Sequence, residues 1–190
     1  MRCHLCLNLS WQPLCKTCLS TFLAPSPAFR VLESGLKVYS FYAYSEIAPL
    51  LHTKHTYSGA KIFTQLAKHC FTPFLQTAHF PDGLYAIPID DHTRHDFSHT
   101  AILARHLKSQ FITPKYNCLK ATNIVKYAGK DLEFRQKNPR KFKLTNISNQ
   151  MTILCDDLIT TGATIKQAKK ALEKKNNEVL FSLTLADAKL

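Results

Sequence analysis

The sequence lacks any hydrophobic stretch long enough to cross a membrane. No run approaches the roughly 20 apolar residues of a transmembrane helix. The opening segment, Met1 to Cys18, is interrupted by polar and cysteine residues and holds no apolar core of a secretory signal. Low-complexity tracts and internal repeats are also missing. These absences exclude membrane-spanning and disordered classes and lead us to expect a cytoplasmic protein.

Acidic residues are scarce. The chain has 13 Asp and Glu against 25 Lys and Arg, which gives a formal charge of +12 and a pI near 9.5. Such an excess favours polyanionic partners, namely nucleic acid, phosphorylated metabolites or an anionic membrane surface. A merely basic surface without a partner is the alternative.

The length and the apolar content predict one main folded domain. At 190 residues, with 45% hydrophobic and 11% aromatic residues, the chain can bury the core of one α/β domain and carry a small appendage. The Pro- and Ser-containing stretch Ala24 to Pro27 reads as a linker. We therefore divide the chain into a cysteine-rich module, residues 1–27, and a main domain, residues 28–190.

Strands and helices alternate along the main domain. Apolar and β-branched runs predict strands over Leu36–Tyr44, Gly83–Asp90, Met151–Cys155 and Glu178–Ala186. Helical spacing of apolar residues predicts helices over Lys61–Phe71, His99–Phe111 and Thr164–Lys175. This alternation predicts a parallel sheet with helices on both faces.

The segment Ile153 to Ile165, ILCDDLITTGATI, carries the strongest functional signal. Its strand is expected to deliver Asp156 and Asp157 to the carboxyl end of the sheet, where ligands of such folds bind. Five residues of the loop that follows offer three hydroxyls, small side chains and the amides of a helix start, a combination that suits a monoester phosphate. They are Thr160, Thr161, Gly162, Ala163 and Thr164, and Gly162 permits a positive φ.

Two adjacent carboxylates beside a phosphate pocket would repel the ligand unless they do another task. Accepting hydrogen bonds from the 2′ and 3′ hydroxyls of a ribose is the natural one, and a Mg²⁺ ion held mostly by substrate oxygens could share Asp156 and Asp157. The segment therefore predicts a site for a phosphorylated ribose. The alternative is an ordinary strand and capped helix with acids at its mouth.

Four of the seven cysteines form two C-x-x-C pairs, Cys3 with Cys6 and Cys15 with Cys18. Four thiolates match the tetrahedral structural site that zinc prefers, although the eight-residue gap is shorter than in the usual zinc ribbon. Disulfides or redox cysteines are the alternative. Cys70, Cys118 and Cys155 lie on apolar faces and are predicted to be core residues.

A basic and aromatic segment, Phe134 to Lys143, is a candidate contact for a polyanion. Cations that follow a backbone and aromatics that stack on bases hold single-stranded DNA without sequence preference. Its candidate DNA-binding residues are Arg135, Lys137, Arg140 and Lys141, with Lys54 and Tyr57 as a weaker second group. A mobile cover over the phosphate pocket and a solvated basic loop are the alternatives.

The segment from Ile153 resembles the signature of type I phosphoribosyltransferases that binds phosphoribosyl pyrophosphate (PRPP). The resemblance implies a parallel sheet flanked by helices, with Asp156 and Asp157 on the ribose hydroxyls, Thr160 to Thr164 on the 5′-phosphate and Mg²⁺ bound with PRPP. It also implies that pyrophosphate lies at Pro88 to Arg94, which makes Arg94 a candidate ligand.

The double C-x-x-C followed by this domain resembles the ComF family of competence proteins. Further likeness comes from Tyr57-Ser58-Gly59, from the loop IPIDDHTR and from Arg135, Asn138 and Phe142. The family implies a role in natural transformation, in which single-stranded DNA is carried across the inner membrane or received on its cytoplasmic side. It also implies contact with the DNA-uptake machinery and a place at the membrane periphery.

Two functions from different classes follow. The first, which the charge and the cysteine module favour, is a PRPP-binding protein that also binds single-stranded DNA. The second is an active phosphoribosyltransferase that moves ribose 5-phosphate to a nitrogenous base, with Asp157 as the candidate general base. No segment identifies a pocket for an acceptor base, so the second ranks lower.

Overall fold

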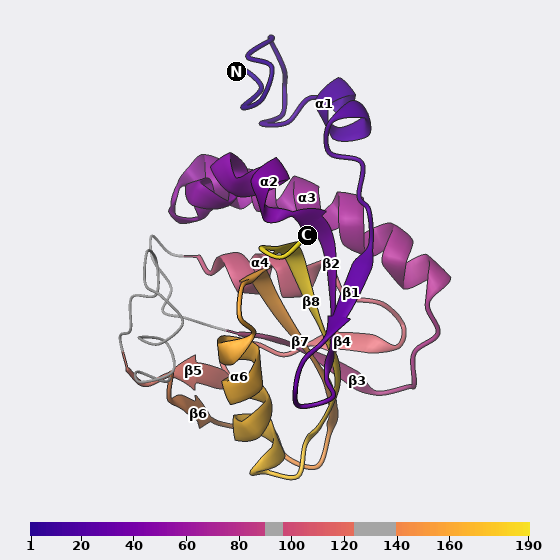
Figure 1. The fold of residues 1–190 in the computed structure, drawn as a ribbon, viewed down its shortest axis with the longest axis vertical. Coiled ribbons are helices and arrows are strands. Elements are labelled where there is room, and N and C mark those ends of the chain that lie inside the picture. The colour runs from indigo at the N-terminus through magenta and orange to yellow at the C-terminus, as the bar shows by residue number, and fades with distance from the viewer. Residues whose placement is uncertain (90–96, 124–139) are drawn as a thin grey trace.

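A six-stranded sheet forms the centre of the protein (Figure 1). The computed structural model describes residues 1–89, 97–123 and 140–190. Across the sheet the strands run in the order β1 (Ala28–Val31), β2 (Lys37–Ala43), β8 (Glu178–Asp187), β7 (Met151–Ile159), β3 (Leu84–Pro88) and β4 (Ile112–Pro114). Only β1 is antiparallel to its neighbour, so the predicted parallel sheet is confirmed.

Helices cover both faces of this sheet. On one face lie α2 (Tyr44–Leu51), α3 (Tyr57–Thr77) and α4 (His99–Arg105). The short 3₁₀ helix η1 (His52–His55) connects α2 to α3. On the other lies α6 (Ala163–Glu173), beside the two-stranded sheet of β5 (Leu119–Ala121) and β6 (Phe142–Leu144). Each face has its own cluster of buried apolar residues.

Strand β7 extends further than the sequence predicts. The expected strand ended at Cys155 with the two acids in a loop, but β7 continues through Asp156 and Asp157 to Ile159. The reason is its neighbour: β8 is ten residues long and stays paired with β7 as far as Ile159 opposite Asp187. Both acids are therefore fixed in the sheet at its carboxyl edge.

Helix α4 is shorter than the sequence predicts. It ends at Arg105 rather than Phe111. The amides of His106 and Leu107 donate to carbonyls three residues back, those of Leu103 and Ala104, which tightens the last turn and ends the α-helix. The Ser109 hydroxyl then accepts from the amides of Phe111 and Ile112 and turns the chain into β4. Short elements such as β1, β4, β5 and β6 leave too few residues for a periodic pattern, and the sequence did not reveal them.

The cysteine-rich N-terminal module, which includes α1 (Lys16–Thr21), packs on α3. Leu14 and Leu23 are fully buried in the same apolar cluster as the residues of α3, and the Tyr42 hydroxyl donates to the carbonyl of Leu23 at 2.9 Å. The module and the sheet thus share one core. Within the part of the chain that is described, no helix is both long and apolar enough to cross a membrane.

Candidate functional site

The turn between β7 and α6 forms a small pocket at the carboxyl edge of the sheet. Its lining comprises Asp156 and the residues from Leu158 to Ile165. Gly162 stands at the N-terminal cap of α6 with φ +80°, and the Thr161 hydroxyl accepts from the amide of Ala163 at 3.3 Å. The start of α6 therefore opens into the pocket with amide groups and hydroxyls, as an anion site requires.

Gly162 is needed here for two separate reasons. Its positive φ is strained for a residue with a side chain. In addition, a Cβ atom at this position would lie 2.7 Å from Cδ2 of Leu32. The Leu32 side chain thus packs directly under the turn, and a glycine allows the backbone to approach it.

Arg30 on β1 secures the other end of the turn. Its guanidinium donates to the carbonyl of Thr160, and Nε lies 3.0 Å from Oδ2 of Asp187 at the end of β8. Asp187 is only 3% exposed, so this ion pair also neutralises a buried carboxylate. Sequence reasoning missed Arg30, because Arg30 and Thr160 are 130 residues apart and β1 was not predicted.

The two adjacent acids have different surroundings. Asp156 is half-buried, lines the pocket and accepts from the amide of Asp157 at 2.9 Å. Asp157 is buried, and its Oδ2 lies 2.9 Å from Nζ of Lys54 and 3.6 Å from Nε2 of His99. One acid thus faces the pocket, while the other joins β7 to η1 and to the start of α4.

The charge state of Asp157 follows from these neighbours. Burial by itself raises the pKa of this carboxyl, but the charges of His99 and Lys54 and the hydrogen bond from Lys54 outweigh it and hold the pKa below its usual range. Asp157 is therefore a carboxylate at neutral pH. A carboxylate with a lowered pKa is a weak proton acceptor, which bears on its predicted role as a general base.

Gly59 lies against η1, the short helix that carries Lys54. A Cβ atom on Gly59 would lie 1.9 Å from the carbonyl oxygen of Thr53, so only glycine allows α3 to begin this close to η1. The Thr56 hydroxyl accepts from the amide of Gly59 at 3.0 Å and caps α3. The neighbouring Lys54 side chain reaches Asp157 and is itself 35% exposed.

The other predicted ligand and DNA-binding residues divide into two groups. Arg94, Arg135 and Lys137 lie outside the described residues. Arg140 and Lys141 precede β6, where their amides donate at 2.8 Å to the side chains of Gln167 on α6 and Asn123, and Tyr57 is exposed at the start of α3. Sequence reasoning also missed His99, whose position after the capping residue Ser98 gave no sign of the distant Asp157.

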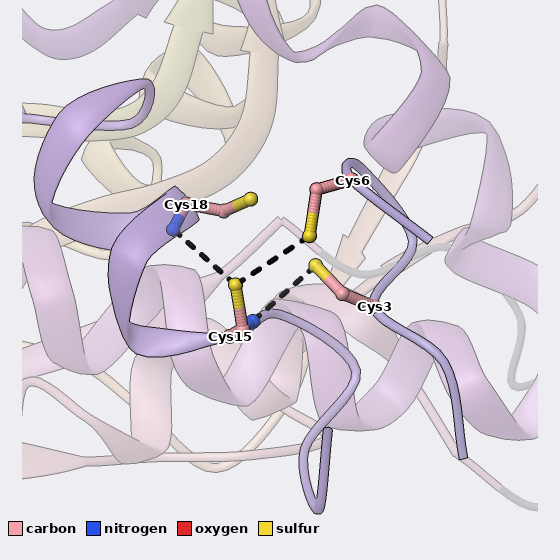
Figure 2. A group of neighbouring side chains, drawn as sticks. All are labelled: Cys3, Cys6, Cys15 and Cys18. Carbon is pink, nitrogen blue, oxygen red and sulfur yellow. Dashed lines mark hydrogen bonds between the residues drawn. The ribbon is translucent and has the colours of Figure 1, made fainter. Parts of the chain in front are cut away.

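The four predicted cysteines form one cluster, shown in Figure 2. Their sulfur atoms all lie within 4.8 Å of one another, and the Sγ atoms of Cys6 and Cys15 are 3.7 Å apart. That separation is too long for a disulfide, and all seven cysteines are free thiols. Cys70, Cys118 and Cys155 are buried, as predicted for core residues.

The cluster fits a tetrahedral metal ion. With sulfur at roughly 2.3 Å from zinc, tetrahedral geometry separates the sulfurs by about 3.8 Å, close to the 3.7 Å between Cys6 and Cys15. Backbone amides support the thiols, since Cys15 donates to Sγ of Cys3 and Cys18 donates to Sγ of Cys15, both at 3.4 Å. Although burial opposes it, donors from Cys15, Cys6 and Leu5 lower the pKa of Cys3 to about 6.

Comparison with known proteins gives similarity of structure without similarity of sequence. No family model and no curated protein matches the chain, so the resemblance to the ComF family stays a prediction. Among solved structures, a hypoxanthine phosphoribosyltransferase from Staphylococcus aureus is 12% identical with a TM-score of 0.42, over 66% of this chain and 62% of that one. The chain thus matches less than two thirds of that enzyme's length.

Two further phosphoribosyltransferases superpose over more of their length. An orotate phosphoribosyltransferase from Aeropyrum pernix is 17% identical with a TM-score of 0.39, over 89% of this chain and 78% of that one. An adenine phosphoribosyltransferase is 14% identical with a TM-score of 0.43, over 90% and 89%. The α/β fold with a parallel sheet and the four-cysteine cluster are confirmed by the structure of the chain itself.

Replacing Gly162 with alanine tests the packing under the turn. Gly162→Ala should cost about 1–2 kcal/mol of unfolding free energy for the positive φ, and about 1 kcal/mol more for displacing the half-buried Leu32. Gly35→Ala is the matched control, because Gly35 also has a positive φ of +75° but nothing within 4 Å of a Cβ. Urea unfolding measures both variants, and equal losses would contradict the packing argument.

Lys54→Met tests the ion pair with Asp157. The variant should lose on the order of 1–3 kcal/mol of unfolding free energy at pH 7, less than a fully buried pair because Lys54 is partly exposed. Since the folded pKa of Asp157 is lowered, its stabilisation is present above an unfolded pKa of about 4 and disappears as the pH falls through the folded value.

Urea unfolding at pH 7 and at lower pH measures this effect, and Lys174→Met, which changes an exposed lysine just after α6, serves as control. The wild-type protein should lose stability on acidification more steeply than Lys54→Met. A loss in Lys54→Met no greater than in the control would refute the pair.

Proposed function

We propose that the chain binds PRPP at the carboxyl edge of its sheet. The observation that carries this proposal is that Asp156 lines the same pocket as the phosphate-type turn from Thr160 to Thr164. A pocket with a carboxylate at one side and a helix start at the other suits a ligand with vicinal hydroxyls next to a phosphate monoester. A phosphorylated ribose has both groups.

The 5′-phosphate would bind at the start of α6. The first turn of a helix leaves amide N–H groups without intrahelical acceptors and carries the positive end of the helix dipole. The hydroxyls of Thr161 and Thr164 add donors, and Gly162 supplies the positive φ with which the chain enters α6. Arg30 and Leu32 hold this turn from behind.

The two acids would divide their tasks. Asp156 faces the pocket and would accept hydrogen bonds from the ribose hydroxyls. Asp157 would act through Lys54 and His99, holding η1 and the start of α4 at the edge of the site. The sequence predicted both acids as ribose ligands and Asp157 also as the candidate general base. The proposal keeps Asp156 as the main ribose ligand and makes Asp157 a positioning residue.

Magnesium would enter with PRPP rather than occupy a site made by the protein alone. His99, Asp156 and Asp157 place one ligand atom each within 4.8 Å of one another, but the Lys54 ammonium at 2.9 Å already neutralises Asp157. Asp156, which lines the pocket, is the carboxylate that suits an ion held mostly by substrate oxygens. Bound Mg²⁺ would neutralise the pyrophosphate charge, and Arg94 is the proposed protein ligand beside it.

The same geometry favours binding over catalysis. Transfer of ribose 5-phosphate to a base needs a group that takes or guides a proton, and the candidate Asp157 has a lowered pKa and a lysine partner. An active phosphoribosyltransferase remains the second candidate function. Release of pyrophosphate from PRPP that requires both a nucleobase and Asp156 would favour it.

The cysteine cluster is proposed to bind one structural zinc ion. The four thiols have the number, the spacing and the amide donors of a closed tetrahedral site. Zinc would replace the thiol protons and join the segment around Cys3 to the start of α1. Because the module shares a core with α3, the ion would stabilise the main domain as well.

Single-stranded DNA is the proposed macromolecular partner, in natural transformation. The charge of +12 supplies the attraction to a polyanion, and the resemblance to the ComF family supplies the setting, with DNA-uptake machinery at the inner membrane as a further partner. Arg135, Lys137, Arg140 and Lys141 remain proposed contacts for the DNA backbone.

A thermal shift with PRPP and Mg²⁺ tests the site. At a ligand concentration of about 100 times Kd, binding adds about 2.7 kcal/mol to the stability of the folded protein. For a chain of this size that corresponds to a rise in Tm of about 5–10 °C. Asp156→Asn should lose most of the rise, whereas Asp82→Asn, which changes an exposed acid that precedes β3 and does not line the pocket, should keep it.

Failure of the wild-type protein to respond to PRPP would contradict the proposed ligand. A full response in Asp156→Asn would leave PRPP as the ligand but remove Asp156 from the ribose contact.

Metal analysis tests the cysteine cluster. The purified protein should hold about one zinc per chain, and the double variant Cys15→Ser/Cys18→Ser should hold none and unfold more easily. Cys118→Ser is the control, because Cys118 is a buried thiol outside the cluster. Metal-free wild-type protein that keeps its full stability would overturn the proposal.

A further inference from the structure

A groove separates the cysteine-rich module from α3. Its walls are the loop that carries Trp11, Gln12 and Pro13 and the exposed face of α3. We call it the Trp11 groove; its lining includes Trp11, Gln12, Pro13, Tyr57, Lys61 and Lys68. It lies apart from the pocket at Asp156, and neither the proposed phosphoribosyl site nor the zinc cluster uses its side chains.

Trp11 is unusual because its side chain is 99% exposed. An exposed indole forgoes the burial that normally stabilises it, so such a residue commonly marks a contact surface. It is also the only tryptophan in the sequence. The exposure of Trp11 marks a defined surface only if hydrogen bonds fix the loop that carries this residue.

Gln65 on α3 holds that loop. Its Oε1 accepts from the amide of Leu14 at 2.9 Å, and its Nε2 donates to the carbonyl of Leu14 at 2.8 Å and to Oε1 of Gln12 at 2.7 Å. The amide of His4 donates to the carbonyl of Pro13 at 2.7 Å, which ties the loop to the cysteine cluster. Trp11 is therefore presented to solvent by a loop anchored on both sides.

Cations stand beside the aromatic residues. Lys61 and Lys68 are exposed and seven residues apart on α3, which places them on one face about 10 Å apart along the helix. Nζ of Lys61 lies 4.8 Å from the centre of the Tyr57 ring. None of the described residues that line the groove is acidic, so its charge complements an anion.

From this arrangement we propose that the Trp11 groove binds a segment of single-stranded nucleic acid, with a base stacked on Trp11 and phosphates beside Lys61 and Lys68. Aromatic faces next to lysines are how single strands are held without sequence preference. The assignment rests on the proposed function in taking single-stranded DNA as the partner, and it locates that partner on a surface distinct from the predicted Arg135 to Lys141 segment.

Two residues that line the groove are close in sequence to the partners of Asp157. Tyr57 at its edge is three residues from Lys54, whose Nζ pairs with Asp157, and Ile102 of its lining is on α4, one turn from His99. The cysteine cluster supports the opposite wall through the bond from His4 to Pro13. Zinc bound by the cysteine cluster would therefore help to fix the loop that presents Trp11.

Because Trp11 is the sole tryptophan, its fluorescence reports on the groove directly. Titration with a thymidine oligonucleotide of about 15 nucleotides, within the size range of a single-strand site, should quench the emission to saturation. The fitted affinity should fall steeply as salt rises, because each neutralised phosphate releases counterions.

Variants locate the contact, with binding followed by the anisotropy of a labelled oligonucleotide. Trp11→Ala should weaken binding about 5- to 160-fold, the range for loss of one stacked base. Lys61→Ala/Lys68→Ala should weaken it and reduce the salt slope by about 1–2. The matched controls are Phe22→Ala, an exposed aromatic of the same module outside the groove, and Lys174→Ala/Lys175→Ala, which removes the same charge from the end of α6.

The outcomes separate the groove from the function on which it rests. Binding by the wild-type protein that Trp11→Ala weakens no more than Phe22→Ala overturns the groove and leaves DNA as a partner. Absence of oligonucleotide binding to the wild-type protein overturns both, whatever the response to PRPP. Trp11→Ala should keep the thermal shift with PRPP, which shows that it is folded.

A membrane surface is the competing occupant, since tryptophan and lysine also line membrane contacts. Vesicles of phosphatidylglycerol and phosphatidylcholine provide that arm of the experiment. A blue shift of Trp11 emission with these vesicles, together with no change on adding oligonucleotide, would overturn the nucleic-acid assignment.

Discussion

The close approach of Gly162 to Leu32 determines the geometry of the phosphate turn. With φ at +80° and the Leu32 side chain packed where a Cβ would project, Gly162 brings the chain from β7 into α6 within one tight turn. Arg30 then fixes the preceding carbonyl and pairs with Asp187 at the end of β8. Arg30 on the edge strand β1 thus connects the turn to Asp187 on the long strand β8, and this connection fixes the turn at the carboxyl edge of the sheet.

A second constraint separates the roles of two neighbouring acids. Because β7 continues to Ile159, Asp156 and Asp157 are strand residues with different surroundings. Asp157 receives Lys54 from η1, and the contact of Gly59 with Thr53 fixes that segment. The Asp157 carboxylate stays ionised and is paired with Lys54 and His99. Its proximity to the pocket therefore does not make it a general base. A site of this kind is better equipped to bind a phosphorylated sugar than to transform it.

The parts of this account that the sequence predicted are those encoded locally. The apolar runs, the order DD-x-x-TTG and the two C-x-x-C pairs each lie within a few residues, and strands, turn and thiol cluster formed where expected. The missed parts depend on distant pairs: Asp157 meets Lys54 across 103 residues, and Thr160 meets Arg30 across 130. No local pattern marks Arg30 or His99. The end of β7 was misjudged for the same reason, since its length is set by pairing with β8.

The cysteine module and the sheet share one core, so the proposed ribose-phosphate pocket and the proposed nucleic-acid groove belong to one packed unit. The central claim is the ribose-phosphate site. Calorimetric titration with ribose 5-phosphate and with 2-deoxyribose 5-phosphate tests it most directly, on the wild-type protein and on Asp156→Asn. The account predicts tighter binding of the ribose by the wild-type protein and no preference in the variant. Equal binding of both sugars by the wild-type protein, or binding of neither, would contradict it.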